Sequence, residues 1–203
     1  VPGTLVIGAD GGAGRALRAG VHVDLVVGDL DSLDGADLDR LVAAGSDVTR
    51  AGRDKDESDT ELALLAAIDR GCEPIVVLGA LGGPRLDHEL ANLLLLAHPR
   101  LDDRDVSIVD GATTVRRIGT ADGPGALDLE GAPGDLLTLL PLAGPVDGVT
   151  THHLRYPLRG ECLLPGPARG LSNELLTPTA SVTTERGRLL VVHTRRSHSE
   201  EAP

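Results

Sequence analysis

Short apolar runs alternate with helical patterns from residue 4 to residue 118, and this alternation limits the possible folds more than any other feature of the sequence. Each run is rich in Val, Ile and Leu and ends at Gly or Asp, which is typical of buried parallel strands. The expected strands are 4–7, 24–27, 74–78 and 106–109, and the expected helices are 13–19, 36–44, 60–70 and 88–97. This order predicts an α/β fold with a mostly parallel sheet covered by helices.

The pattern changes from about residue 119, where Gly, Pro and Thr become frequent and helical periodicity ends. Short strands are expected at 136–140, 180–184 and 188–193, and residues 185–187 resemble a hairpin turn between the last two. This pattern of short strands and turns predicts a small antiparallel β domain. We therefore expect an α/β domain over 1–118, a β domain over 119–195 and a polar tail over 196–203.

Composition excludes several classes of function. The 203 residues carry a net charge of −12 and include one Tyr but no Phe or Trp, which disfavours a phosphate backbone or stacked bases as partner. No apolar run approaches the ~18 residues that a membrane span needs. The N-terminus lacks the layout of a signal peptide, so the expected location is the cytoplasm. We predict neither a nucleic-acid partner nor a membrane partner.

Acidic side chains follow the predicted strands at the points where those strands end. Ligands of open parallel sheets bind outside the carboxyl ends of the strands. Asp10 follows the first run, Asp29 and Asp31 follow the second, and a glycine pair leads to Arg85 and Asp87 after the third. In extended chain, Asp29 and Asp31 face the same side about 7 Å apart. Such a pair suits Mg²⁺, which shares hard oxygen ligands with substrate phosphates, although Asp31 could instead serve solubility or helix capping.

A second acidic group precedes the third helix. Residues 24–61 hold twelve acidic residues against four basic ones. Ser58 and Glu61 form the spacing of a capping box, and Asp59 falls in the first turn, where the helix dipole favours a negative charge. Lys55 is the only lysine beside eighteen arginines, and it could contact phosphate or balance the local charge.

The fourth helix begins with a comparable cluster. Asp87 is placed to cap this helix, and His88 and Asn92 lie on one face at i and i+4. Arg85 could clamp a phosphate through two hydrogen bonds, or it could be an ordinary solvated arginine. The chain has no GxxxxGK[ST], GxGxxG, GxSxG or HExxH motif. The residues alone thus predict an acidic, glycine-edged, Mg²⁺-dependent phosphate site.

Several ordered segments together closely resemble the thiamine pyrophosphokinase family. They are ADGGA at 9–13, DLVVGDLDS at 24–32, DKDESDTELA at 54–63, LGALGG at 78–83 with DHELAN at 87–92, LRYPL at 154–158 and GLSNE at 170–174. The resemblance covers nearly the whole chain. It implies an α/β catalytic domain, a C-terminal β-sandwich, a homodimer with sites shared between subunits, and transfer of a pyrophosphoryl group from ATP to the thiamine hydroxyl with Mg²⁺, releasing AMP.

The resemblance also implies roles for particular residues. Asp29, Asp31 and Asp59 would hold Mg²⁺, and Asp10 and Asp87 would organise metal-bound water or the thiamine hydroxyl. The ATP or phosphate contacts would come from Gly11, Gly12, Lys55, Ser58, Gly82, Gly83, Arg85, His88 and Asn92. Ser172 and Asn173 would hydrogen-bond the aminopyrimidine, and Tyr156 offers the chain's one aromatic ring.

Two alternatives stay open at this point. Related pyrophosphokinases act on a hydroxymethyl pterin, and the Ser172-Asn173 segment favours thiamine over that acceptor. Family members usually begin with a further strand and helix before ADGGA, which motivates the alternative of a non-catalytic nucleotide-binding module. Turnover with each acceptor, and Mg-ATP binding beside it, would separate the three.

Overall fold

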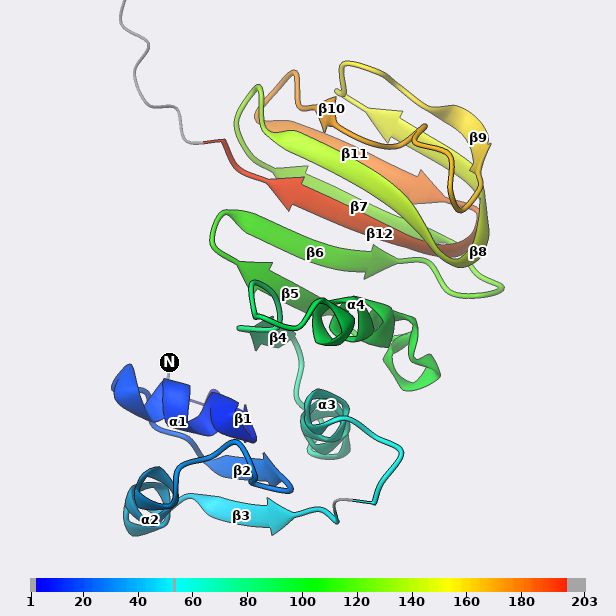
Figure 1. Cartoon of the computed structure of the whole chain (residues 1–203). Coiled ribbons are helices and arrows are strands. Elements are labelled where there is room, and N and C mark those ends of the chain that lie inside the picture. Colours follow the sequence, from blue (N-terminus) through cyan, green and yellow to red (C-terminus); the bar gives the residue numbers. More distant parts are fainter. Residues whose placement is uncertain (1–2, 53, 197–203) are drawn as a thin grey trace, which may run out of the picture. The chain divides into compact units, whose positions relative to one another are not determined.

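The computed structural model describes residues 3–52 and 54–196, and its contacts divide the chain into two compact units, Val1–Ile75 and Val76–Pro203 (Figure 1). We call these the first and the second unit. The predicted polar tail, apart from residue 196, lies outside the described residues. The predicted division into domains at residue 118 remains a prediction.

The first unit contains a small parallel sheet with three helices. Its strands are β1 (Ile7–Ala9), β2 (Leu25–Gly28) and β3 (Asp47–Arg50), in the order β1-β2-β3. Its helices are α1 (Gly11–Arg18), α2 (Gly35–Ala43) and α3 (Asp59–Asp69). All four residues of β2 are buried, as its continuous LVVG run predicts for a central parallel strand.

The core of the first unit explains why these segments fold together. Its fully or nearly buried side chains come from α1, α2 and the segments around β2: Ala13, Val23, Val26, Leu30, Leu33 and Leu41. Gly8 in β1 permits this packing, because a Cβ there would lie 2.5 Å from the Cβ of Ala13 in α1. At one edge of the unit, the ends of β1 and β2 lie beside the first turns of α1 and α3.

The second unit is built on a nine-stranded sheet. Its elements are β4 (Ile75–Leu78), α4 (Leu86–Leu94), the 3-10 turns η1 (Leu95–Ala97) and η2 (Pro99–Leu101), β5 (Val106–Asp110), β6 (Thr113–Ile118), β7 (Gly125–Glu130), β8 (Leu136–His152), β9 (Arg159–Leu163), β10 (Asn173–Glu174), β11 (Thr179–Thr184) and β12 (Arg186–Thr194). The strand order is β4-β5-β6-β12-β8-β11-β7, and β9 and β10 also pair with β8.

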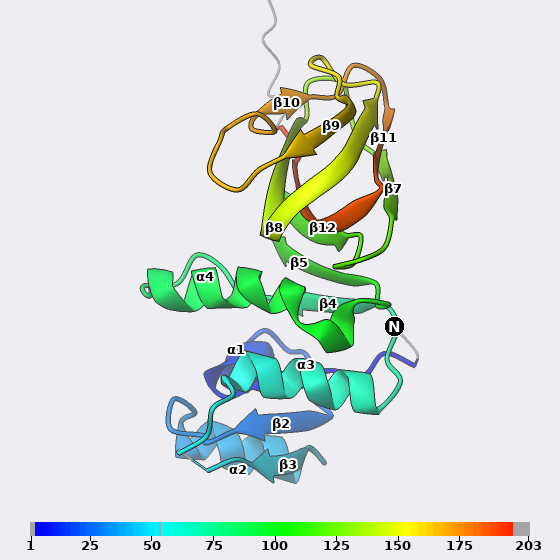
Figure 2. The ribbon, with the colours of Figure 1, turned by 90° about the vertical axis from the view of Figure 1, so that its right-hand side faces the viewer.

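The long strand β8 curls this sheet (Figure 2). Residues 136–142 of β8 pair with β12, whereas residues 150–152 pair with β11. The two ends of β8 therefore belong to different parts of the curled sheet. Between Leu142 and Asp147 the register with β12 shifts, and Gly144 there has a φ of 142° that other residues rarely adopt. The curl encloses a core of alternating inward side chains that includes Leu137, Leu139, Val146 and Val182.

The predicted fold class is confirmed: a parallel sheet with helices precedes a largely antiparallel β region. Two local predictions were wrong. The run at 74–78 forms β4, which joins the large sheet beside β5 instead of the parallel sheet. Residues 185–187 do not close a hairpin, because β11 and β12 lie on opposite sides of β8. The third parallel strand, β3, was not predicted, since its DVTR sequence is mostly exposed and carries no apolar run.

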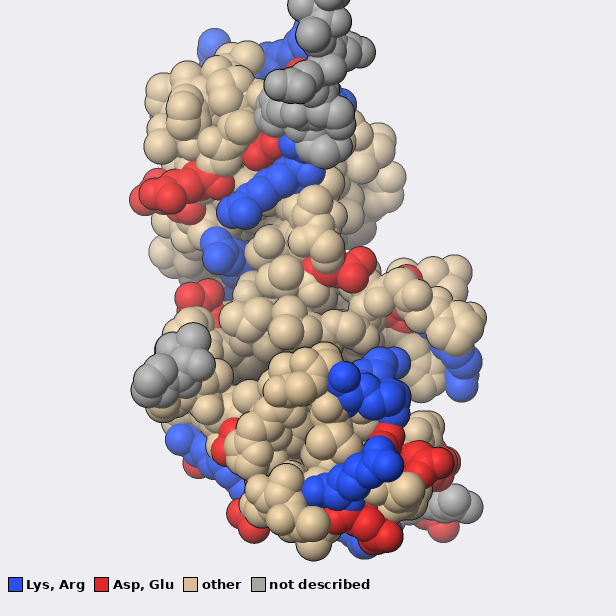
Figure 3. Space-filling model, turned by 90° about the vertical axis from the view of Figure 1, so that its left-hand side faces the viewer, with Lys and Arg blue, Asp and Glu red and all other residues tan. Residues whose placement is uncertain are grey.

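Charged side chains of both signs lie on the surface of the two units. On the face drawn in Figure 3, acidic and basic side chains lie interspersed over each unit. Among the described residues, no helix has the length and apolarity needed to span a membrane.

Candidate active site

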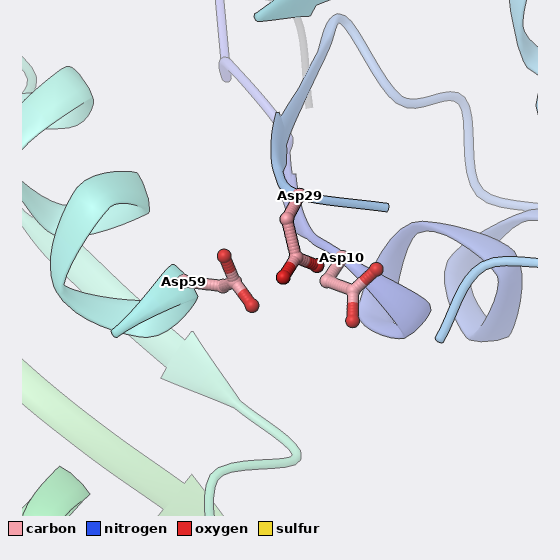
Figure 4. Close-up of side chains that lie close together, drawn as sticks. All are labelled: Asp10, Asp29 and Asp59. Atoms are coloured by element: carbon pink, nitrogen blue, oxygen red, sulfur yellow. The ribbon is translucent and has the colours of Figure 1, made fainter. Parts of the chain in front are cut away.

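Three carboxylates converge at the edge of the parallel sheet in the first unit (Figure 4). Asp10 follows β1, Asp29 follows β2 and Asp59 opens α3. Each offers one oxygen, and these oxygens all lie within 4.8 Å of one another. Two unit charges at that distance repel by roughly 3 kcal/mol at an effective dielectric of about 20. The group, which we call the carboxylate trio, is therefore arranged for a cation.

Asp10 is the most constrained member of the trio. It is the N-cap residue of α1 with a φ of 45°, and its N–H donates to Val27 O at 2.8 Å, which ties it to the end of β2. Its side chain is only 8% exposed and makes no capping hydrogen bond. Its Oδ1 is buried without a hydrogen-bond partner among the described residues. Buried polar atoms normally have partners, so this oxygen indicates a ligand position.

Gly28 allows the trio to close. It ends β2 with a φ of 144°, and a Cβ there would lie 2.9 Å from Asp59 Oδ1 and 3.1 Å from Asp10 Cβ. Any other residue would push these two carboxylates apart and strain the backbone. The glycine after the second apolar run is thus required by a close approach of side chains.

Asp31 lies outside the trio. Its N–H donates to Asp29 Oδ1 at 3.1 Å, and its own side chain is exposed and accepts a hydrogen bond from Ser32 Oγ at 3.1 Å. The residue between the two acids, Leu30, is buried with a φ of 64°, which turns the chain sharply after Asp29. This turn cancels the same-side geometry that an extended chain would give, and Asp31 as a metal ligand remains a prediction.

Lys55 is a cation in direct contact with the trio. Its Nζ donates to Asp59 Oδ1 at 2.5 Å, and its side chain is only 15% exposed. The hydrogen bond to Asp59 raises the pKa of Lys55, and the charges of Asp59, Asp29 and Asp10 raise it further against the effect of burial. Lys55 therefore stays protonated and compensates one of three negative charges.

Neighbouring residues of the predicted phosphate set have structural roles. Ser58 is the N-cap of α3, and its hydroxyl accepts from the Glu61 N–H at 3.1 Å, as the capping box predicts. Gly11 opens α1, where a Cβ would lie 3.0 Å from Ser32 O. Gly12 has open space around it in the first turn of the same helix.

Arg85 and Asp87 belong to the second unit and pair with each other. Arg85 Nε donates to Asp87 Oδ1 at 3.0 Å, and its Nη2 donates to Asp87 Oδ2. This pairing is the main cause that lowers the pKa of Asp87 to about 2. The predicted cap was wrong, because α4 has Arg85 as N-cap and Asp87 lies within its first turn.

Of the remaining predicted residues around α4, one holds the neighbouring loop by a hydrogen bond and the others are exposed. Asn92 Nδ2 donates to Ala80 O at 2.8 Å, which fixes the helix to the loop after β4. His88 is exposed on the first turn, and Gly82 and Gly83 are exposed in the loop, with a φ of 76° at Gly82. Asn92 thus stabilises the loop that carries the glycine pair.

Asn173 and Tyr156 form one connected unit in the β region. The Asn173 side chain donates to Tyr156 O at 2.7 Å and accepts from Tyr156 N at 2.9 Å and from Glu174 N at 3.0 Å. Asn173 is 5% exposed, whereas Tyr156 is 55% exposed. Ser172 is exposed, with a φ of 55°. The side-chain oxygen of Asn173 is therefore committed to the backbone around Tyr156, a role that the sequence reasoning missed.

Arg155 lies over the ring of Tyr156 and pairs with Glu174. The Arg155 guanidinium lies 5.9 Å from the ring centroid and pairs with Glu174 at 2.9 Å. The aromatic ring is thus presented to solvent on a loop whose backbone and neighbouring charges are fixed.

Comparisons with known proteins agree with this geometry. A family model described as "Thiamin pyrophosphokinase, catalytic domain" matches residues 3–109, and one described as "Thiamin pyrophosphokinase, vitamin B1 binding domain" matches residues 126–189. The first match contains the carboxylate trio. The second contains Tyr156, Ser172 and Asn173.

Individual relatives show the same pattern. A thiamine pyrophosphokinase of Bacillus subtilis is 26% identical over 190 residues, which cover 93% of this chain and 86% of that protein. The crystal structure of thiamine pyrophosphokinase from Bacillus subtilis aligns over 97% of this chain and 90% of its own, with 26% identity and a TM-score of 0.83. That of the Geobacillus thermodenitrificans protein aligns over 98% and 90%, with 28% identity and a TM-score of 0.82.

Proposed function

Because the chain belongs to the thiamin pyrophosphokinase family, we propose that it transfers the pyrophosphoryl group of ATP to the hydroxyl of thiamine, giving thiamine diphosphate and AMP. The observation that carries this proposal is the trio of Asp10, Asp29 and Asp59 within a chain that matches both family models. The match to a vitamin B1 binding domain favours thiamine over a pterin as acceptor. Positioning and charge neutralisation dominate transfers of this kind.

We propose that the trio binds Mg²⁺. The donor set fits, because Mg²⁺ prefers hard oxygen ligands and often combines one or two carboxylates with substrate phosphates. The unpartnered Oδ1 of Asp10 supplies an oxygen that has no other use among the described contacts. A bound magnesium ion would neutralise phosphate charge and polarise the phosphoryl oxygens. Asp31 would contact the metal through water, since its side chain faces solvent.

The chain's own residues would hold the triphosphate beside the trio. Gly11 and Gly12 place backbone N–H groups in the first turn of α1, where the helix dipole favours an anion. Lys55 adds a positive charge from the loop before α3. For the second unit we propose phosphate contacts by Gly82, Gly83 and Arg85. ATP as donor also favours a cytoplasmic location.

Asp87 would orient the acceptor hydroxyl instead of removing its proton. With a pKa of about 2, this carboxylate is ionised at neutral pH and is a weak base. It can accept a hydrogen bond from the hydroxyl while Arg85 keeps it in place. The hydroxyl oxygen would bond to the β-phosphorus of ATP as the bond from that phosphorus to the oxygen that leaves with AMP breaks, and the hydroxyl proton would pass to solvent.

Tyr156 and Ser172 would contact the thiamine rings, and Asn173 would act by fixing the backbone of Tyr156. We propose a homodimer in which these residues complete the site of the partner subunit. Mixing an inactive Asp29→Asn chain with an inactive Tyr156→Ala chain should then restore activity in heterodimers. A monomer that turns over, or no rescue despite subunit exchange, would contradict the shared site and leave the reaction itself standing.

Product analysis tests the reaction. Phosphorus NMR of a mixture of protein, Mg-ATP and thiamine should show AMP and thiamine diphosphate, and Asp29→Asn under the same conditions should show neither. ADP with thiamine monophosphate would contradict the proposal. Turnover of a hydroxymethyl pterin but not of thiamine would favour the alternative acceptor. Mg-ATP binding without turnover of either acceptor would favour the non-catalytic module.

A further inference from the structure

Lys55 is paired with one member of the carboxylate trio. Its Nζ donates to Asp59 Oδ1, and Asp59 supplies one of the three converging oxygens. The residue lies four positions before Asp59, in the loop that precedes α3, so its side chain folds back onto the first turn of the helix. At 15% exposure, the Lys55 side chain is withdrawn from solvent.

The charge balance explains why a cation is drawn there. Three carboxylates within 4.8 Å carry three negative charges, and Lys55 supplies one positive charge. Lysine carries a compact ammonium on a flexible stem, whereas the planar fork of arginine would hold a carboxylate through two hydrogen bonds. The chain uses lysine at this one position and arginine at all eighteen others. The Lys55 ammonium can therefore leave Asp59 more readily than an arginine guanidinium could.

We propose that the Lys55 ammonium competes with the metal ion for Asp59 and moves to the phosphates of the nucleotide when the metal binds. This inference rests on the proposed metal site. It makes the nucleotide-free enzyme a weak metal binder, because the ion must displace Lys55 from Asp59. A triphosphate offers Lys55 another partner, so metal and nucleotide favour each other's binding, and this coupling is reciprocal.

Binding of Mn²⁺ alone tests the competition without turnover. Free Mn²⁺ is measured by electron paramagnetic resonance during titration of the nucleotide-free protein. Lys55→Met keeps the apolar stem and removes the charge, and it should bind Mn²⁺ at least about tenfold more tightly than the native chain. Lys55→Arg, which keeps a charge and adds a fork, should bind no more tightly than the native chain.

Arg40→Met is the matched control. Arg40 is 71% exposed on α2 and interacts with Asp37, so this variant removes one positive charge outside the trio. Its Mn²⁺ affinity should change by less than about twofold, because solvent screens exposed charges. Circular dichroism confirms that each variant is folded.

Three results would overturn the inference, and they are distinguishable. If Lys55→Met binds Mn²⁺ as the native chain does, or more weakly, the metal site stands and the competition is wrong. If Arg40→Met tightens binding as much as Lys55→Met, net charge is the cause. If neither the native chain nor Lys55→Met binds Mn²⁺, the metal site of the proposed function fails together with the inference.

Discussion

Two groups of charged side chains lie in the two units, and they are built in opposite ways. In the first unit the carboxylate trio sets three acids against Lys55, and Asp10 Oδ1 is buried without a partner. In the second unit Asp102 is outnumbered by Arg117 and Arg188, of which Arg188 donates to both carboxylate oxygens, at 2.8 and 2.5 Å. The second group is held by hydrogen bonds to Asp102 and to backbone carbonyls, whereas the first group leaves Asp10 Oδ1 without a partner.

The contacts of Arg117 show what the second group is for. Its side chain is 5% exposed, and it donates to the carbonyl oxygens of Leu101, Asp102 and Gly119. These bonds fix the turn η2 to β6, and Arg188 attaches β12 to the same turn. A charged group that is hydrogen-bonded within the fold therefore indicates a structural role, and a buried carboxylate oxygen without a partner indicates a site for an ion. The following predictions test that distinction.

The largest effect is expected from the trio. Asp29→Asn should lower turnover about 100-fold or more, because it removes a charge that positions a transferring phosphate. The free energy of unfolding should stay equal or rise, since mutual repulsion within the trio falls. Asp31→Asn is the control and should lose less activity, because its side chain is exposed outside the trio. Equal losses in both variants would contradict the assignment.

Gly28→Ala should disturb the trio through its geometry. A Cβ at this position meets Asp59 and Asp10, and the φ of 144° is strained for alanine. We expect a loss of about 1–3 kcal/mol in the free energy of unfolding. Metal affinity should also fall, because two of the ligands are pushed apart. Gly35→Ala, with open space around it at the start of α2, should change neither quantity.

Asp102→Asn should destabilise the fold and spare the chemistry. It leaves Arg117 and Arg188 without their carboxylate, and the unfolding free energy should fall by about 1–2 kcal/mol. That is less than for a fully buried pair, because the Asp102 side chain is 22% exposed. Turnover per folded molecule should be unchanged. A loss of turnover at temperatures where the variant is fully folded would contradict the structural role.

The smallest effect concerns pH. The hydrogen bonds from Arg188 are the main cause that lowers the pKa of Asp102 below its ordinary value of 3.8. Asp102 therefore contributes stability above pH 3.8, and this contribution is lost as the pH falls through the lower folded-state pKa. The difference in unfolding free energy between the native chain and Asp102→Asn should be constant near neutrality and shrink below about pH 4. A difference that persists at lower pH would show that packing, not charge, is the cause.

The sequence predicted those parts of the site that depend on strand ends and helix starts. Asp10, Asp29 and Asp59 were all singled out, because each stands where an apolar run ends or a capped helix begins. The predicted metal ligands were Asp29, Asp31 and Asp59, whereas the carboxylates that converge are Asp10, Asp29 and Asp59. This difference could not be predicted. It depends on the positive φ of Leu30, which turns the chain after Asp29, and the residue types at these positions do not indicate such a turn.

Long-range pairing accounts for the other differences. β3 is polar and β4 is apolar, yet β3 joins the parallel sheet and β4 joins the large one. The local periodicity of apolar residues indicates which side chains are buried, but it does not indicate which strand pairs with which. Likewise, the hydrogen bonds that bind Asn173 to Tyr156 join positions seventeen apart, and only the folded β region brings them together.

The central claim is that the carboxylate trio, and not the other charged group, is a metal site. Thermal unfolding with and without millimolar Mg²⁺ tests it directly, because a ligand that binds only the folded chain raises its melting temperature. Mg²⁺ should raise the Tm of the native chain and of Asp102→Asn by the same amount, and should leave the Tm of Asp10→Asn and Asp29→Asn unchanged. An Mg²⁺-dependent rise retained in both trio variants, or absent from both the native chain and Lys55→Met, would contradict the account.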